Sequence, residues 1–182
     1  MGFFLVFFII FIIVIVFILK SAIEFDAQER EQIRRDLYGS SSFTRDPSLN
    51  DNKTFIYYED FESRWIISSG RGKYGTSNGF KYQDGPGCYV ITVYSHPVTD
   101  DNWNNYEDIY IGQSVNVCQR VHNHFNGKGN GDVYADIKYG KYVYVHFVMC
   151  QESEMNDVEK RLIRAFNATK SYNKTCGGSA KR

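Results

Sequence analysis

Apolar positions dominate the start of the chain and then stop abruptly. Residues 2–19 carry no polar side chain. As an α-helix this run would be about 27 Å long, close to the hydrocarbon thickness of a lipid bilayer. We therefore expect a transmembrane anchor at residues 2–19. A cleaved signal peptide and a buried core helix are the alternatives, but no Lys or Arg precedes the run, and residues 19–23 make a poor cleavage site.

A polar segment, residues 20–53, separates this run from the rest of the chain. Its first part, residues 24–37, is dense in charge and predicts a short juxtamembrane helix. The remainder is rich in serine and asparagine, which is typical of a linker. Basic side chains near the apolar run all follow it, so the positive-inside rule places the C-terminal domain in the cytoplasm. The expected location is a membrane, with a single pass.

Short apolar runs return at residues 55–58 and 65–67, where aromatic and β-branched side chains favour strands. A glycine-dense, mildly basic loop follows. Its Arg71 and Lys73 are candidate contacts to nucleic acid, with flexible turns as the simpler explanation of the glycines. We expect residues 54–85 to form an N-terminal extension of a folded domain.

The second half of the chain has the pattern of a compact α/β unit. Alternating apolar positions predict strands at residues 88–94, 108–112 and 142–149, of which the first two should pair antiparallel. Apolar positions at helical spacing predict one helix that begins at Ser114 and a second that begins at Ser153. The expected α/β (α+β) fold is a small three-stranded antiparallel sheet flanked by helices.

Polar side chains occupy particular faces of these two helices. Arg120 and His124 are four residues apart, so they project from one face of the first helix, away from its apolar stripe. Glu159 lies beside the apolar stripe of the second helix rather than opposite it. Arg120 and His124 can therefore reach a common site.

These residues could together hydrolyse a phosphodiester, which needs a proton acceptor, positive charge on the transition state and often a metal. Glu159 offers a hard oxygen ligand suited to Mg2+ or Mn2+. Arg120 carries a permanent charge and a planar fork that fits phosphate oxygens. Tyr89 and Tyr110 lie on the two paired strands, and either could take a proton from water, with His124 as a relay.

The residues stand in an order that resembles the GIY-YIG nuclease family over residues 86–173. The family shows Gly-x-Tyr on one strand, Tyr-x-Gly on the next, an arginine and then a His or Tyr on a helix, a metal-binding glutamate and a late asparagine. The matching positions here are Tyr89, Tyr110, Arg120, His124, Glu159 and Asn173. Two features depart from the family pattern: a longer, acidic connection between the tyrosines, and Cys88 beside Tyr89.

The resemblance implies a catalytic domain over residues 86–176, with Tyr89, Tyr110, Arg120, His124 and Asn173 as catalytic residues and Glu159 as the Mg2+ or Mn2+ ligand. It implies endonuclease activity on DNA, with RNA as a second possible substrate and a separate partner as a possible source of specificity. The alternative is a membrane-tethered module that keeps this fold and binds nucleic acid or acts as a scaffold without turnover.

Charge and cysteine content add two constraints. Formal net charge is zero, but residues 160–182 contain seven Lys or Arg and no Asp or Glu. Such a polarised basic segment, together with Lys128 in a glycine-rich loop, could face phosphates. The four cysteines form no Cys-x-x-Cys pair, so we expect free thiols rather than a zinc site, with disulfides only if the chain leaves the cytoplasm.

Overall fold

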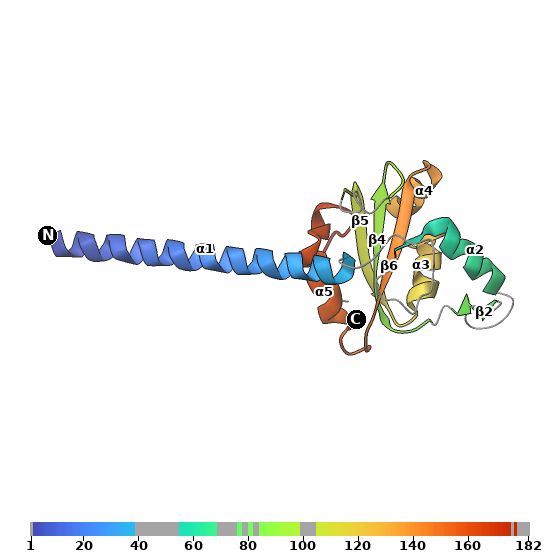
Figure 1. Cartoon of the computed structure of the whole chain (residues 1–182), viewed down its shortest axis with the longest axis horizontal. Coiled ribbons are helices and arrows are strands. Elements are labelled where there is room, and N and C mark those ends of the chain that lie inside the picture. Colours follow the sequence, from blue (N-terminus) through green and yellow to red (C-terminus); the bar gives the residue numbers. More distant parts are fainter. Residues whose placement is uncertain are drawn as a thin grey trace.

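The computed structural model describes the backbone of residues 2–38, 55–68, 76–77, 80–81, 84–98, 105–175 and 177. Within these ranges, the side chains of some positions lie outside the description: residues 2–11, 17, 34–38, 64–68, 76–77 and 80–81. The described chain forms a long N-terminal helix attached to a three-layer domain, in which helices cover both faces of a sheet (Figure 1).

The sheet contains four antiparallel strands in the order β1-β6-β4-β5. Its two central strands are β4 (Gly87–Tyr94) and β6 (Tyr142–Met149), and its edges are β1 (Ile56–Tyr57) and β5 (Asp108–Ser114). The three strands predicted from the second half of the chain are confirmed. A fourth is present because β1 pairs with β6, Ile56 opposite Val145.

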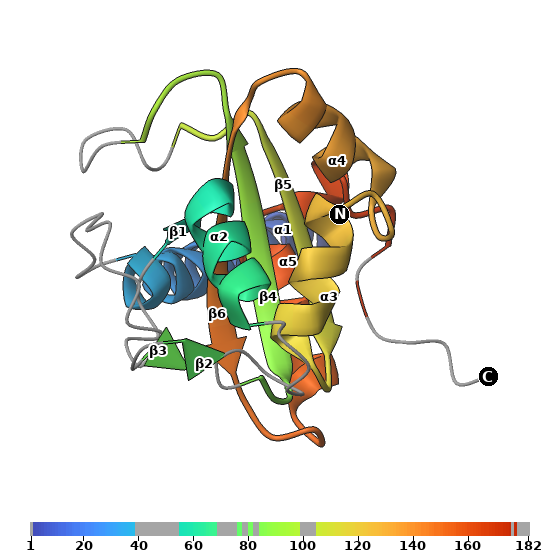
Figure 2. The ribbon, with the colours of Figure 1, turned by 90° about the vertical axis from the view of Figure 1, so that its right-hand side faces the viewer.

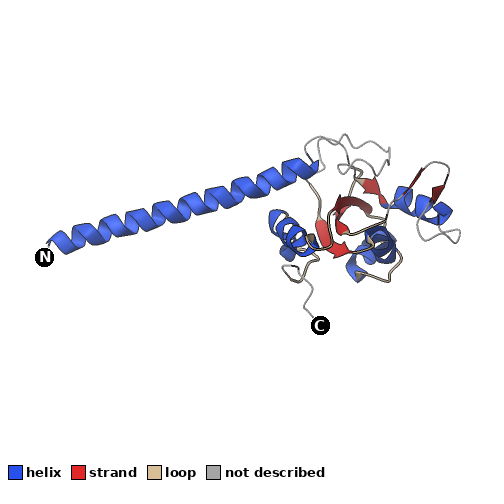
Figure 3. Cartoon of the chain, turned by 90° about the horizontal axis from the view of Figure 1, so that it is seen from below, coloured by secondary structure: helices blue, strands red, loops and turns tan. Residues whose placement is uncertain are grey.

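One face of the sheet is covered by α2 (Tyr58–Ser68), α3 (Val117–Phe125) and α4 (Gly131–Lys138) (Figure 2). The other face is covered by α5 (Met155–Ala165). Every residue of β4 is buried, because helices pack against it from both sides. Figure 3 shows this layering from below, with strands between the two groups of helices.

Several element boundaries differ from those predicted. Residues 65–67 are helical rather than extended: Tyr58 and Phe61 of α2, three residues apart, both pack into the core, as one helical face requires. Helix α3 begins at Val117 instead of Ser114. Its free backbone N–H groups are satisfied from outside the helix, since Asp84 accepts from those of Cys118 (2.9 Å) and Gln119 (3.2 Å).

The C-terminal half also contains elements that the pattern did not predict. Helix α4 was missed, although Asn130 caps it by accepting from the backbone N–H groups of Asp132 and Val133. Helix α5 begins at Met155, with Glu154 rather than Ser153 at the N-cap. Short additions complete the fold: a small hairpin of β2 (Thr76–Ser77) and β3 (Phe80–Lys81), and a 3-10 turn, η1 (Ala168–Lys170).

The N-terminal helix α1 (Gly2–Tyr38) is continuous, so the predicted anchor and juxtamembrane helix are one element. It projects from the domain (Figure 1), and its C-terminal part lies against α5, where Ile33 packs on the core. Within the described part of the chain, no helix has an apolar stretch long enough to cross a bilayer. The predicted anchor is therefore not found as a membrane-spanning helix among the described residues, and the side chains of residues 2–11 and 17 lie outside the description.

Helix α2 should be an integral part of the domain rather than an appendage. Phe61 is fully buried, with ring centroids 5.6 Å from Phe125 and 5.9 Å from Phe147. We expect Phe61→Ala to lower the free energy of unfolding in urea by about 3–5 kcal/mol, the cost of a large core cavity. The surface control Tyr139→Ala, at a position 84% exposed, should change it by less than about 0.5 kcal/mol. Equal values for the two variants would show that α2 does not stabilise the core.

Candidate active site

Two tyrosines lie on the paired strands β4 and β5. Tyr89 is opposite Gly112, and Tyr110 is opposite Ile91, with the two phenol rings 6.3 Å apart between centroids. A Cβ atom at Gly112 would overlap with the hydroxyl of Tyr89. Gly112 therefore provides the space that the Tyr89 phenol occupies, which gives the glycine of the Tyr-x-Gly motif a steric role.

His124 of α3 is buried against both tyrosines. Its Nε2 lies 2.8 Å from the hydroxyl of Tyr89, and its ring centroid is 4.9 Å from that of Tyr110. Burial, together with the positive charge of Arg120, lowers the pKa of His124 to about 4. The imidazole is consequently neutral at physiological pH.

Arg120 lies one helical turn before His124, on the exposed side of α3. Burial raises the pKa of both Tyr89 and Tyr110, and the positive charge of Arg120 opposes that shift in each. The guanidinium is thus close enough to act electrostatically on both phenols. An exposed cation beside the hydroxyls of buried Tyr89 and half-buried Tyr110 can bind an anionic group that approaches from solvent.

Glu159 of α5 completes the group from the other side of the sheet. Glu159 as a whole residue is 8% exposed, and its Oε2 accepts a hydrogen bond of 2.9 Å from Nε2 of Gln113, at the end of β5. The same amide nitrogen donates to Asn156, one turn earlier on α5, at 2.7 Å. The negative charge of Glu159 raises the pKa of Tyr89 and Tyr110, so all three groups act within one site.

Asn173 holds the edge strand rather than facing the phenols. Its Oδ1 accepts from the backbone N–H of Ile111 at 2.8 Å, and its Nδ2 donates to the carbonyl of Ile111 at 2.7 Å. Ile111 lies between Tyr110 and Gly112, so this pair of bonds fixes the backbone of the Tyr-x-Gly motif. Asn173 is in this way a positioning residue.

Among the described residues, one carboxylate has the chemistry of a Mg2+ ligand, and there is no multi-ligand metal cage. No group of three His, Cys, Asp or Glu side chains gathers among them. A single carboxylate fits Mg2+, which keeps most of its waters and binds through one or two carboxylates. Glu159, slightly exposed and oriented by Gln113, has the chemistry of such a ligand.

Of the three residues predicted to contact nucleic acid, the structure describes only one. Arg71 and Lys73 lie outside the described residues. Lys128 is exposed in the turn between α3 and α4. The three described cysteines, Cys88, Cys118 and Cys150, are free thiols, as expected.

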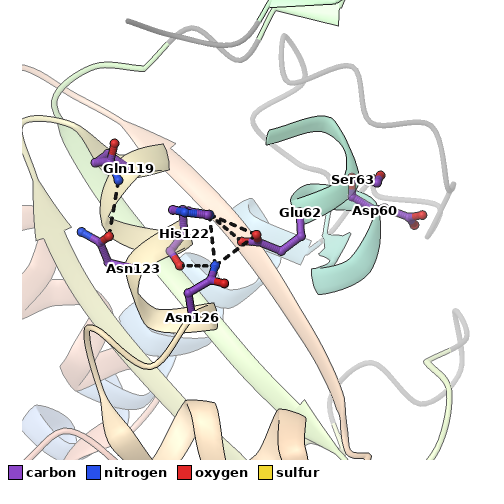
Figure 4. A network of polar contacts seen from close by, with 7 residues as sticks. All are labelled: Asp60, Glu62, Ser63, Gln119, His122, Asn123 and Asn126. Carbon is purple, nitrogen blue, oxygen red and sulfur yellow. Dashed lines mark hydrogen bonds and ion pairs between the residues drawn. The ribbon is translucent and has the colours of Figure 1, made fainter. Parts of the chain in front are cut away.

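A second polar network ties the N-terminal extension to the helix that carries Arg120 and His124 (Figure 4). Glu62 of α2 accepts at 3.0 Å from Nδ1 of His122, and Asn126 donates to the same carboxylate at 3.1 Å. These contacts give His122 a structural role. The sequence did not indicate the role of Gln113 or Glu62, because polar side chains at such positions are common on surfaces.

Comparison with known proteins agrees with this geometry. Residues 86–173 match the family model of the GIY-YIG catalytic domain, whose members are endonucleases. No curated protein and no solved structure matches the chain. The matched range begins just before β4 and ends at Asn173, so it includes every residue of the site described above. Residues 86–173 are therefore similar in sequence to the GIY-YIG catalytic domain.

Proposed function

We propose that this domain is a metal-dependent endonuclease that hydrolyses DNA phosphodiester bonds. The observation that carries the proposal is the grouping of five side chains from β4, β5, α3 and α5: Tyr89, Tyr110, Arg120, His124 and Glu159. Two phenols, an imidazole, a guanidinium and a carboxylate are the groups that such a hydrolysis needs. The match to a family of endonucleases supports the same reaction class.

In this proposal a tyrosine acts in its ionised form, and the attacking water gives its proton to the phenolate oxygen, which becomes a neutral hydroxyl. Tyr89 is the better candidate, because its hydroxyl is hydrogen-bonded to His124. The water oxygen forms the new bond to phosphorus, the bond to the leaving sugar oxygen breaks, and that oxygen takes a proton from solvent. Arg120 stabilises the charge that develops on the phosphoryl oxygens.

Glu159 would hold the metal, Mg2+ or Mn2+, with Gln113 orienting the carboxylate through its hydrogen bond to Oε2. When bound, the metal would supply positive charge for the leaving oxygen. Tyr110 would complete the wall of the site, since its ring centroid lies 6.3 Å from that of Tyr89 and 4.9 Å from that of His124.

The basic segment 160–182, with Lys128 and the loop residues Arg71 and Lys73, would contact the phosphate backbone. The same charges would serve an RNA backbone, so RNA is the second substrate to test. A separate DNA-binding partner would supply sequence preference. The rival proposal is a silent nucleic-acid-binding or scaffolding module with this fold, and turnover separates the two.

Location is a second proposal: residues 2–19 hold the chain at a membrane, with the C-terminal domain in the cytoplasm. Its support is the apolar run itself and the exposed apolar side chains on α1, among them Ile13, Val16, Ile18 and Leu19. A membrane would cover these side chains, whose exposure to water is otherwise unfavourable.

The metal assignment predicts the behaviour of Glu159→Gln. This change removes the ligand charge but keeps the size of the side chain, so we expect nicking of supercoiled DNA with Mg2+ to fall to the background rate. Binding to DNA should persist. The matched control Glu152→Gln, on an exposed residue before α5, should nick as fast as the parent. If Glu159→Gln nicks at the parent rate, Glu159 is not the ligand; if the parent binds but never nicks, the silent module is correct.

The pKa of His124 predicts the pH dependence of cleavage. Its pKa of about 4 means that His124 stays neutral through the range in which an ordinary histidine titrates. The rate should therefore rise with pH as a tyrosine loses its proton, without an inflection near pH 6.5. Single-turnover rates from pH 5 to 10 measure this. An inflection near 6.5 that disappears in His124→Gln would contradict the buried, neutral histidine.

The proposed location predicts that the full chain remains with the membrane fraction after an alkaline carbonate wash. Protease added outside intact cells should leave the C-terminal domain uncut, and the same protease should cut it once the cells are opened. Recovery of the chain in the soluble fraction, or cleavage from outside, would refute the anchor or its orientation respectively.

A further inference from the structure

We propose that the turn between α3 and α4 holds His124 in a single tautomer. In this tautomer the backbone N–H of Asn130 donates to Nδ1, and the imidazole proton on Nε2 is donated to the hydroxyl of Tyr89. This inference rests on the proposed function only for its effect on cleavage. It assigns positioning roles to Gly129 and Asn130 and changes the role of His124 from proton relay to hydrogen-bond donor.

Both ring nitrogens of His124 have a partner. Nδ1 lies 2.6 Å from the backbone nitrogen of Asn130, and Nε2 lies 2.8 Å from the hydroxyl of Tyr89. A backbone N–H can only donate, so Nδ1 must present its lone pair. A neutral imidazole carries one proton, which is then on Nε2.

The environment removes the other protonation states. A charged imidazolium would carry a proton on Nδ1, facing the N–H of Asn130 donor to donor. Burial and the charge of Arg120 also disfavour that form, lowering the pKa of His124 to about 4. The opposite neutral tautomer would produce the same clash of two protons. One tautomer is compatible with the turn at physiological pH.

This tautomer determines which way protons can move. Because Nε2 already carries a proton, His124 cannot accept one from Tyr89. It can instead donate a hydrogen bond to the phenol oxygen, and such a bond is stronger when that oxygen is a phenolate. Of the two tyrosines, Tyr89 is therefore the one whose ionised form would receive a hydrogen bond from the imidazole, and this bond opposes the rise in its pKa that burial causes.

The turn is shaped for this contact. A Cβ atom at Gly129 would overlap with Nδ1 of His124. Gly129 is not among the described glycines with positive φ, so backbone conformation does not require a glycine there. Asn130 is fixed in turn, because its Oδ1 caps α4 by accepting from the N–H groups of Asp132 (2.8 Å) and Val133 (3.3 Å). Buried Val133 anchors that helix in the core.

The tautomer can be measured directly by long-range proton–nitrogen NMR on the nitrogen-15-labelled full chain at neutral pH. The signals of His124 are assigned by their loss in His124→Gln. We expect a protonated Nε2 and an unprotonated Nδ1 in the parent. A protonated Nδ1 in the parent would overturn the proposal.

Two variants disrupt the contact between the turn and Nδ1 of His124, and each has a matched control. Gly129→Ala places a methyl group against Nδ1, whereas Gly131→Ala, two residues on, adds a methyl group with no atom within 4 Å. Asn130→Pro deletes the N–H at a φ of −74° that proline adopts, whereas Asn130→Ala loses the cap but keeps the N–H. We expect the two disruptive variants to lose the single tautomer and both controls to keep it.

The rate of DNA cleavage should depend on the tautomer of His124. We expect Gly129→Ala and Asn130→Pro to nick roughly 100-fold more slowly, the scale of a lost acid–base contribution, while circular dichroism shows a folded chain. If one of the two variants fails to fold, the other variant and the NMR spectrum of the parent protein still test the proposed tautomer. An unchanged tautomer in both disruptive variants would refute the role of the turn. A parent with the expected tautomer and no turnover would refute the proposed function alone.

Discussion

The candidate site depends on the burial of β4 from both sides. A polar side chain on a strand covered by helices on each face gains stability from a hydrogen-bond partner, because an unpaired buried hydroxyl is costly. Tyr89 has such a partner in His124, which belongs to a helix on the same face. The contact between β4 and α3 therefore serves the stability of the core and the chemistry of the site at once.

Close approach is the second constraint, and two glycines permit it. Gly112 leaves room for the Tyr89 phenol on the neighbouring strand. Gly129, in the turn between α3 and α4, leaves room for the His124 ring. A methyl group at either position would overlap with a site residue. The phenol of Tyr89 and the imidazole of His124 can form their hydrogen bond only because the backbone at Gly112 approaches the phenol closely and the backbone at Gly129 approaches the imidazole closely.

The surrounding elements keep this arrangement rigid. Glu62 ties α2 to α3 through His122, Gln113 ties β5 to α5 through Glu159, and Asn173 holds the edge strand at Ile111. Each contact joins segments far apart in the sequence, so the helices that carry the guanidinium and the carboxylate cannot shift independently of the sheet. Such support is what a preorganised site requires.

The amino-acid sequence by itself determined the three long strands, the two flanking helices and the order of the site residues. Alternating and four-residue apolar spacing is a local signal, and Arg120 with His124 on one helical face follows from it. The tertiary structure decided the helical state of residues 58–68, the presence of α4 and the partners of Gln113 and Asn130. A backbone N–H occurs at nearly every position, so no residue type marks the one that reaches His124. Only packing selects it.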